Sequence, residues 1–207
     1  MHKSVLLNEV IANMNIKEDG IYVDATLGFG GHSSSILKEI KKGFLFAFDQ
    51  DEEAISSSYE RLSKSYDNFL IIKDNFVNMR KRLMEQNVSC VDGIIFDLGV
   101  SSPQLDEAYR GFSYHNDARL DMRMDRNNKL SAYEVVNDYD EDDLARIIYN
   151  YGEEKYAKQI ARAIEEKRSI KKIETTLELS DVISSAVPAK YKRLTHPARR
   201  TFQAIRI

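Results

Sequence analysis

The sequence predicts an α/β protein: a Rossmann-like domain with a parallel sheet, followed by a helical subdomain. Short apolar runs alternate with helical stretches over the first hundred residues, which is typical of a parallel sheet with right-handed crossovers. The first apolar run enters a glycine-rich turn and the second ends on an acid. That order of strand, glycine turn, helix, strand and acid is the first half of a doubly wound nucleotide site.

Four strands and three connecting helices make up the predicted first domain. Ligands of such sheets bind beyond the carboxyl ends of the strands, so the four strand exits are the places to look for a site. The strands are expected at 21–26, 44–48, 69–73 and 92–97, and the helices at 33–41, 51–65 and 76–87.

The glycine turn narrows the class of ligand. Gly28 and Gly30 fit a dinucleotide fingerprint, but Ser33 stands where its third glycine belongs, and no phosphate-loop lysine follows. Asp49, about 20 residues past the first glycine, is placed to accept hydrogen bonds from ribose hydroxyls. The pattern favours a nucleoside ligand without a pyrophosphate, such as S-adenosylmethionine (SAM). The alternative is a plain turn whose glycines serve packing.

Length and composition are those of an ordinary globular protein. The 207 residues, 43% hydrophobic and 30% charged, allow one or two domains. The single cysteine, Cys90, cannot form an internal disulfide, and we expect a buried thiol in a cytoplasmic protein. The N-terminal apolar run is too short for a signal peptide, and no stretch is long enough to span a membrane, so no membrane partner is expected.

The charge is divided unevenly along the chain. Residues 1–150 carry 17 Lys and Arg against 26 Asp and Glu, whereas residues 151–207 carry 13 against 7. No acid follows Ala186. A basic end on an acidic body suggests a polyanionic partner, and the alternative is a solvated helix face. The candidate phosphate contacts are Lys190, Lys192, Arg193, Arg199 and Arg200.

Helical signals dominate after Gln104. Capping boxes at 131–134 and 175–178 each open a helix, and Pro188 ends the second one. Further helices are expected at 140–149 and 153–167, where Tyr156, Ile160 and Ile164 recur every four residues on one face. The segment 119–125 could be a short helix or an ordered loop.

The exit of the fourth strand carries the second informative motif. Four apolar residues end on Asp97, and a Ser-Ser-Pro turn follows. An exocyclic amine on a base ring is a poor nucleophile, and acceptors that hold its N–H bonds can orient it for attack on a methyl group. Asp97 is therefore the candidate catalytic residue. The alternative is a carboxylate that only caps the next turn.

These motifs together resemble the RsmH (MraW) methyltransferases over the whole chain. The resemblance implies SAM-dependent N4-methylation of a cytosine in the decoding centre of bacterial 16S ribosomal RNA, with the small ribosomal subunit as partner. The matching segments are Val5-Leu-Leu-Asn-Glu9 after His2, Thr26-Leu-Gly-Phe-Gly-Gly-His32, Asp97-Leu-Gly-Val-Ser-Ser-Pro-Gln-Leu-Asp106, Arg110-Gly-Phe-Ser113, Leu120-Asp-Met-Arg-Met-Asp125, Tyr151-Gly-Glu-Glu154 and His196-Pro-Ala-Arg-Arg-Thr-Phe-Gln-Ala-Ile-Arg206.

The resemblance also implies a set of cofactor contacts. They lie on the glycine turn, at the ribose-binding acid, after strand three and on the strand-four turn. The residues are Gly30, Gly31, His32, Asp49, Phe76, Asp97 and Gln104. For His32 the alternative is a residue at the helix start without ligand contact.

The family pattern also sets the expected domain bounds. Residues 1–104 would form a class I SAM-dependent methyltransferase domain, and residues 105–200 an inserted helical domain that recognises the substrate. Residues 201–207 would begin the return of the chain to the methyltransferase domain. Family members continue past this C-terminus, so we expect an incomplete sheet. Strand four would then be an exposed edge or lie beside a partner chain in a homodimer.

Three other functions are weighed against this one. The basic end disfavours methylation of a small amine, and Ser33 disfavours a nicotinamide oxidoreductase. The third alternative, a fragment that binds SAM and RNA without catalysing methyl transfer, stays open. The four histidines have no zinc-ligand spacing, so no metal is expected. Cys90 precedes strand four, which disfavours a cysteine adduct.

Overall fold

The computed structural model describes residues 4–193 and 195–206, so His2 of the first matching segment lies outside the described residues. The chain divides between Ser101 and Ser102 into two compact units. Each unit has its own core and is described by itself. The predicted domain boundaries, after 104 and after 200, stay predictions.

The first unit is built on a parallel sheet of four strands, as predicted. Its strands are β1 (Ile21–Asp24), β2 (Phe44–Asp49), β3 (Phe69–Lys73) and β4 (Gly93–Ile95), in the order β3-β2-β1-β4. The chain steps outward from β1 to β3 and then crosses to the other side of β1. The strand order therefore reverses between β1 and β4, which is where open α/β sheets bind ligands.

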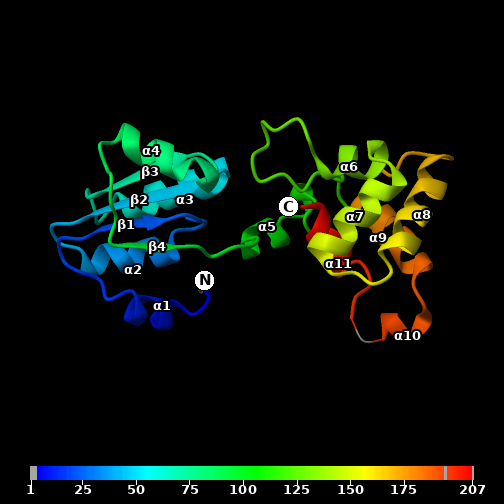
Figure 1. Ribbon diagram of the computed structural model, residues 1–207, viewed down its shortest axis with the longest axis horizontal. Helices are drawn as coiled ribbons and strands as arrows, with labels where there is room; N and C mark the ends of the chain where they lie inside the picture. The colour runs from blue at the N-terminus through cyan, green and yellow to red at the C-terminus, as the bar shows by residue number, and fades with distance from the viewer. Residues whose placement is uncertain (1–3, 194, 207) are drawn as a thin grey trace. The chain divides into compact units, whose positions relative to one another are not determined.

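Helices cover both faces of this sheet (Figure 1). Helix α2 packs with Tyr22 and Leu45 on one face, whereas α4 packs with Val23 and Phe46 on the other. Neighbouring residues of a strand point to opposite faces, which is why one strand feeds both clusters. The helices are α1 (Leu7–Asn13), α2 (Gly31–Glu39), α3 (Glu52–Leu62), the 3₁₀ turn η1 (Phe76–Asn78) and α4 (Met79–Glu85).

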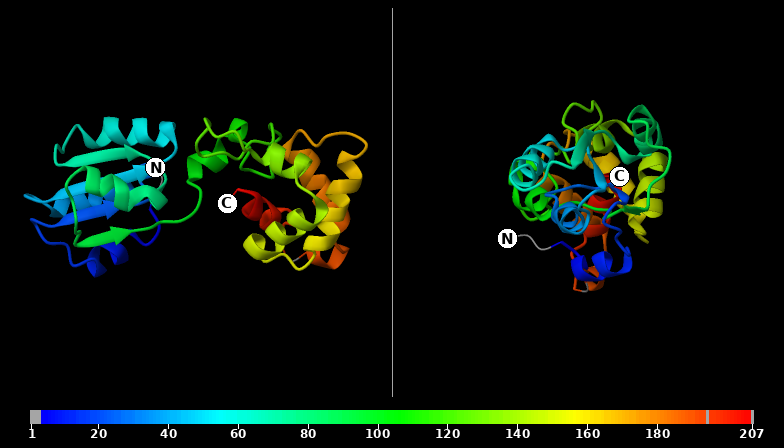
Figure 2. Two further views of the ribbon diagram at one scale, coloured as in Figure 1. Left: turned by 45° about the horizontal axis from the view of Figure 1, so that its top comes forward. Right: turned by 90° about the vertical axis from the view of Figure 1, so that its left-hand side faces the viewer.

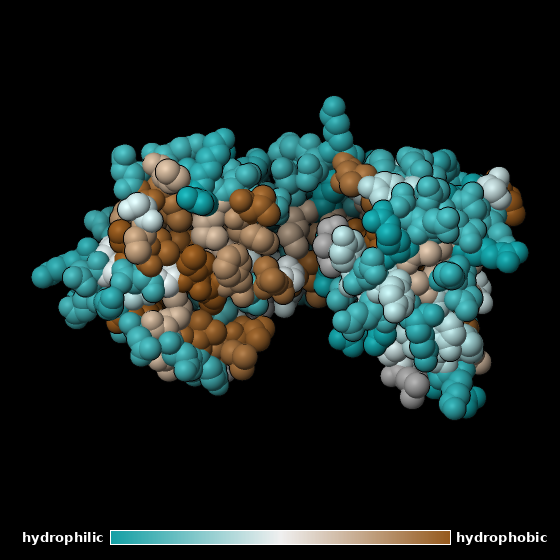
Figure 3. All heavy atoms as spheres, in the orientation of Figure 1, coloured by the Kyte–Doolittle hydropathy of each residue, from teal (hydrophilic) through white to brown (hydrophobic). Residues whose placement is uncertain are grey.

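Among the residues that the structure describes, β4 is an edge strand of the sheet, as expected. It pairs with β1 on one side, and apolar side chains stay exposed along it and beyond it: Ile94 is 43%, Phe96 47% and Leu98 69% exposed. Figure 3 shows apolar residues gathered on the face of the first unit that is turned to the viewer. Backbone groups at such an edge can pair with a further strand.

The second unit is helical. Both predicted capping boxes are present, with Ser131 opening α6 and Thr175 opening α9, and α9 ends at Ala186 just before Pro188. Figure 2 shows the yellow and orange helices of this unit packed side by side. The elements are α5 (Ser102–Asp106), η2 (Ala108–Arg110), α6 (Ala132–Asp138), α7 (Glu141–Gly152), α8 (Ala157–Arg168), α9 (Thr176–Ala186), α10 (Ala189–Lys192) and α11 (Arg199–Ile205).

Helix α8 begins four residues later than the sequence predicts. Glu153 takes a left-handed conformation, with φ of 51°, and ends α7. Tyr156 is the residue before the helix, so the buried face of α8 consists of Ala157, Ile160, Ala161 and Ile164. Helix α11 approaches α7 at Gly152, where an added Cβ would lie 2.5 Å from the Arg200 carbonyl oxygen.

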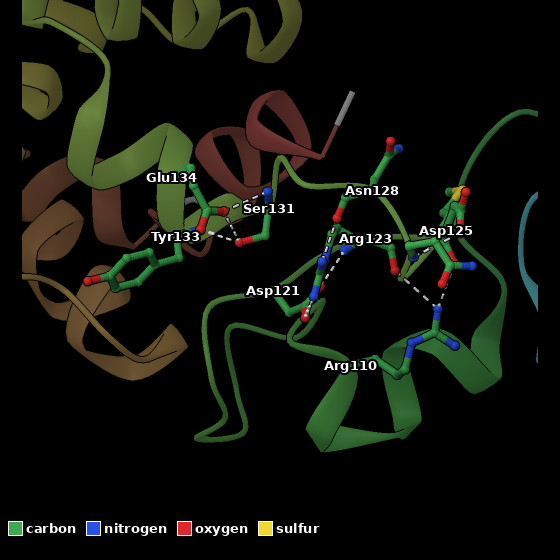
Figure 4. Close-up of polar contacts among 10 residues, drawn as sticks. Arg110, Asp121, Arg123, Asp125, Asn128, Ser131, Tyr133 and Glu134 are labelled. Carbon is green, nitrogen blue, oxygen red and sulfur yellow. Dashed lines mark hydrogen bonds and ion pairs between the residues drawn. The ribbon is translucent and has the colours of Figure 1, made fainter.

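The segment 119–125 is an ordered loop rather than a helix (Figure 4). Arg123 forms an ion pair of 2.7 Å with Asp121, and Arg110, which is buried, donates to the carbonyl oxygen of Arg123 at 3.2 Å. Burial alone would raise the pKa of Asp121, but the hydrogen bonds and charge of Arg123 hold this pKa below its usual value.

One expectation about burial is wrong. Cys90 is exposed, because it lies in the loop between α4 and β4 and not in the apolar strand that follows. Among the described residues, no helix is long and apolar enough to cross a membrane.

Candidate functional site

The glycine turn between β1 and α2 takes a backbone path that favours glycine. Gly28 and Gly30 have φ of 49° and 68°, in the left-handed region. A Cβ added at Gly31 would lie 1.9 Å from the Ser4 hydroxyl oxygen, so the N-terminal segment packs on the turn. The Leu27 N–H donates to the Phe48 carbonyl at 2.9 Å and ties the turn to β2.

Asp49 lies at the end of β2 and holds the glycine turn directly. The Gly28 N–H donates to its Oδ2 at 2.7 Å, and the Asp51 N–H donates to Oδ1 at 2.9 Å. Burial raises the pKa of Asp49. The backbone N–H of Gln50 also acts on this carboxylate. A carboxylate accepts about four hydrogen bonds, so the contacts from Gly28, Asp51 and Gln50 still leave room for a ribose hydroxyl.

Asp24 is a buried acid that sequence reasoning did not select. The Ser33 hydroxyl donates to its Oδ2 at 2.6 Å, and the Thr26 N–H donates to Oδ1 at 3.1 Å. Burial raises the pKa of Asp24. The contact gives Ser33 a structural role at the place where a dinucleotide fingerprint has glycine. The signal in the sequence was an acid inside the first apolar run.

Asp97 lies just beyond β4, next to the turn. Its backbone N–H donates to the Thr26 hydroxyl oxygen at 2.7 Å, while its side chain is 45% exposed. Asp97 Oδ2 lies 3.8 Å from Nδ1 of His32, which is buried. The described structure thus brings Asp97, His32 and the glycine turn together within the first unit.

Phe76 follows β3 and lies beside an aromatic residue of the strand-four exit. Its ring meets the Phe96 ring edge to face, with centroids 5.5 Å apart. Hydrogen bonds from Asn78 and Arg82 hold the pKa of the neighbouring Asp74 below its usual value.

Gln104 is buried on α5 of the second unit, and its contact with a cofactor stays a prediction.

The five basic candidates for phosphate contact are all exposed. Arg200 also donates to the carbonyl oxygen of Glu153, so it has a partner inside the second unit. The other four lie on or beside α10 and at the start of α11: Lys190, Lys192, Arg193 and Arg199. Their contact with RNA stays a prediction.

An aromatic cluster in the second unit escaped the sequence analysis. The rings of Tyr114 and His196 stack with centroids 4.3 Å apart, and Phe202 meets Tyr114 edge to face. Burial, and then the charge of His115, lower the pKa of His196. The cluster joins the loop before residue 119 to α11, which residue spacing alone did not indicate.

The geometry of the first unit suits an adenosine-type ligand. An added Cβ at Gly28 would meet no side chain within 4 Å, Asp49 offers acceptor sites, and Asp97 presents a carboxylate at the strand-order reversal. Within the ranges that the structure describes, no group of three or more His, Cys, Asp or Glu side chains could hold a metal ion.

Comparison with known proteins adds a family match. The model of the MraW methylase family matches residues 1–207. A "Ribosomal RNA small subunit methyltransferase H" of Exiguobacterium sibiricum is 58% identical over 207 residues, which are 100% of this chain and 66% of that protein. Proteins of the same name from Clostridium botulinum strain Kyoto and Limosilactobacillus fermentum are 58% and 51% identical, and 67% of each is covered. The chain thus spans about two thirds of the length of these relatives.

Two solved structures were also matched. A putative rRNA-methylase from Clostridium thermocellum has a TM-score of 0.39 at 25% identity, over 48% of this chain and 54% of that one. An rRNA methylase from Streptococcus thermophilus has a TM-score of 0.39 at 22% identity, over 57% of this chain and 71% of that one.

Proposed function

The chain belongs to the MraW methylase family, and from this premise we propose that it takes part in SAM-dependent N4-methylation of a cytosine in the decoding centre of 16S ribosomal RNA. Relatives that are 51% to 58% identical carry the name of a small-subunit ribosomal RNA methyltransferase. The proposed partner is therefore the small ribosomal subunit, and the proposed location is the cytoplasm.

The observation that carries the cofactor proposal is the hydrogen bond between Asp49 and the glycine turn. This bond sets a carboxylate with spare acceptor capacity beside a turn whose glycines 28 and 30 take the left-handed conformation. Asp49 would accept from the ribose hydroxyls, and the Phe76 ring would cover the adenine. Gly30 and Gly31 would contact the ligand through their backbone, while Ser58, Arg61 and Ser4 fill the space of their missing Cβ atoms. The bound cofactor would supply a methyl group carried on a sulfonium sulfur.

Asp97 is the proposed catalytic residue. Its backbone is held by Thr26 while its carboxylate is partly exposed at the strand-order reversal. A carboxylate there would accept N–H bonds from the exocyclic amine of the cytosine and orient the nitrogen lone pair for in-line attack. Gln104 is proposed as a further contact near the methionine part of the cofactor.

The basic residues of the second unit are proposed to hold RNA phosphates. The formal charge of the whole chain is −3, so RNA would approach it through the acid-free stretch after Ala186. The open edge at β4 is the proposed place for further strands of the sheet or for a second copy of the chain.

The test is transfer of labelled methyl groups from SAM to small ribosomal subunits that lack the modification. Digestion to nucleosides should place the label in N4-methylcytidine, and the control is the Asp97→Ala variant. Label in another nucleoside would overturn the site assignment. Label transferred equally well to free cytidine would favour an enzyme for small amines. Binding of SAM and RNA without transfer, under conditions where a longer relative is active, would favour the non-catalytic reading.

A further inference from the structure

His32 is buried although the carboxylate beside it is partly exposed. The His32 ring nitrogens both face protein atoms: Nε2 lies 3.1 Å from the Val5 carbonyl oxygen, and Nδ1 lies 3.8 Å from Asp97 Oδ2. Only 5% of His32 is exposed. The imidazole therefore has protein partners on both sides before any ligand arrives.

The Val5 carbonyl at Nε2 shows that this nitrogen carries a proton, and an attraction between Nδ1 and the Asp97 carboxylate requires a second proton on Nδ1, so the pair is one of imidazolium and carboxylate. A carbonyl oxygen only accepts, so Nε2 is the donor in the bond to Val5. Val5 belongs to the segment that packs on the glycine turn, because Ser4 lies against Gly31. His32 is thus held from the N-terminal segment, with Nδ1 aimed at Asp97.

Asp97 is held less completely than His32. The bond from its backbone N–H to Thr26 fixes the main chain, whereas its side chain is 45% exposed. Among the described residues, His32 is the side chain that forms an ion pair with the Asp97 carboxylate when both of its ring nitrogens carry a proton. The direction of that carboxylate therefore depends on where the imidazole stands.

We propose that His32 is a positioning residue that acts through Asp97 and does not bind the cofactor with its ring. It ties the N-terminal segment to the Asp97 carboxylate and holds the carboxylate toward the reacting amine. This inference rests on the proposed function for its consequence, while the pairing itself is a property of the free protein.

Two amide variants distinguish the roles of the two ring nitrogens of His32. The amide nitrogen of His32→Gln can replace Nε2 at Val5, and that of His32→Asn can replace Nδ1 at Asp97. We expect His32→Gln to leave the affinity for SAM within about threefold and to lower single-turnover methyl transfer by about tenfold or more, as loss of a contact to a charged group does. His32→Asn should recover part of this rate. A purely structural role predicts no such split.

A ligand role for the ring predicts the opposite pattern. If both variants lose SAM affinity by more than about tenfold while the rate at saturating SAM is kept, the imidazole binds the cofactor and the proposal is wrong.

Nitrogen NMR of the free chain tests the pairing without turnover. His32→Gln assigns the two imidazole signals of His32, and Asp97→Asn should move the Nδ1 signal and leave that of Nε2 unchanged. An unmoved Nδ1 signal would overturn the proposal whether or not methyl transfer is seen. A moved Nδ1 signal together with absent transfer would count against the proposed function only.

Discussion

Asp49 and Gly28 are joined across the sheet by a hydrogen bond of 2.7 Å from the glycine N–H to the carboxylate Oδ2. The acid at the end of β2 thus holds the turn that follows β1, although 21 residues separate the two. This bond gives Asp49 two roles, one in the turn and one toward a ribose, and variants can separate them.

We expect Asp49→Ala to weaken SAM binding by on the order of 1–3 kcal/mol, because it leaves ribose hydroxyls and the Gly28 N–H without an acceptor. Asp49→Asn keeps one acceptor for the turn and removes the charge. Its affinity for SAM, measured by calorimetric titration, should therefore lie between those of the parent chain and of Asp49→Ala. Binding of NAD, or an unchanged SAM affinity in Asp49→Ala, would contradict the assignment.

Asp97→Ala should lower single-turnover methyl transfer by on the order of 100-fold or more, by analogy with the loss of one preorganised electrostatic partner. The residue lies outside the core, so thermal unfolding should change little. Asp97→Asn keeps an acceptor and should retain more rate than Asp97→Ala. A rate close to that of the parent chain would make Asp97 a turn residue only.

Arg199 and Arg200 should respond differently to replacement by Ala. Loss of a phosphate contact should lower the log–log salt slope of RNA binding by about one unit at most, and we expect this for Arg199→Ala at an unchanged melting temperature. Arg200→Ala should also lower the melting temperature, because Arg200 donates to the Glu153 carbonyl. If neither variant changes the salt slope of RNA binding, the RNA contact lies elsewhere on the chain.

Tyr191→Phe should destabilise the second unit by about 1–3 kcal/mol, because it leaves a buried carboxylate oxygen unpaired. Tyr191 donates to Glu154 Oε2 at 2.5 Å, and Glu154 is fully buried. Tyr156→Phe is the matched control, since Tyr156 reaches Glu154 through its backbone N–H. Denaturant titration measures both, and equal effects would show that the bond from the Tyr191 hydroxyl to Glu154 contributes no more to stability than the hydroxyl of Tyr156 does.

The same hydroxyl should make stability depend on alkaline pH. Burial, and then the bond to Glu154, raise the pKa of Tyr191 from 10.0 to about 12. The folded protein therefore keeps this proton longer than the unfolded chain, and the free energy of unfolding should fall as the pH rises through this window. In Tyr191→Phe the free energy of unfolding should decrease less over the same pH range, and unfolding titrations at several alkaline pH values measure this difference.

At acidic pH the buried Asp24 should also make the free energy of unfolding decrease as the pH rises. Burial raises its pKa above 3.8, so the folded protein binds more protons than the unfolded chain just above that pH. The free energy of unfolding should then decrease as the pH rises from about 3.8 through the folded pKa. Unfolding of Asp24→Asn at several pH values checks this, and an identical pH dependence in the variant would show that Asp24 is not responsible.

Local patterns in the sequence were sufficient for much of the fold. Apolar runs bounded by turns located all four strands. The capping boxes at Ser131 and Thr175 located the first residues of two helices, because caps act over three or four neighbouring positions. The glycine turn and the acid at 49 were also visible, since each depends on residue type at a fixed spacing.

Tertiary contacts decided what spacing could not. Cys90 is exposed because its loop leaves the strand, and α8 starts at Ala157 because Glu153 turns left-handed where α7 ends. The partners of His32 come from residues 27 positions before it and 65 after it, at Val5 and Asp97. A sequence shows which groups a chain carries, but only folding brings such distant groups within hydrogen-bonding or ion-pair distance, and that proximity determines what Asp97 and His32 can do.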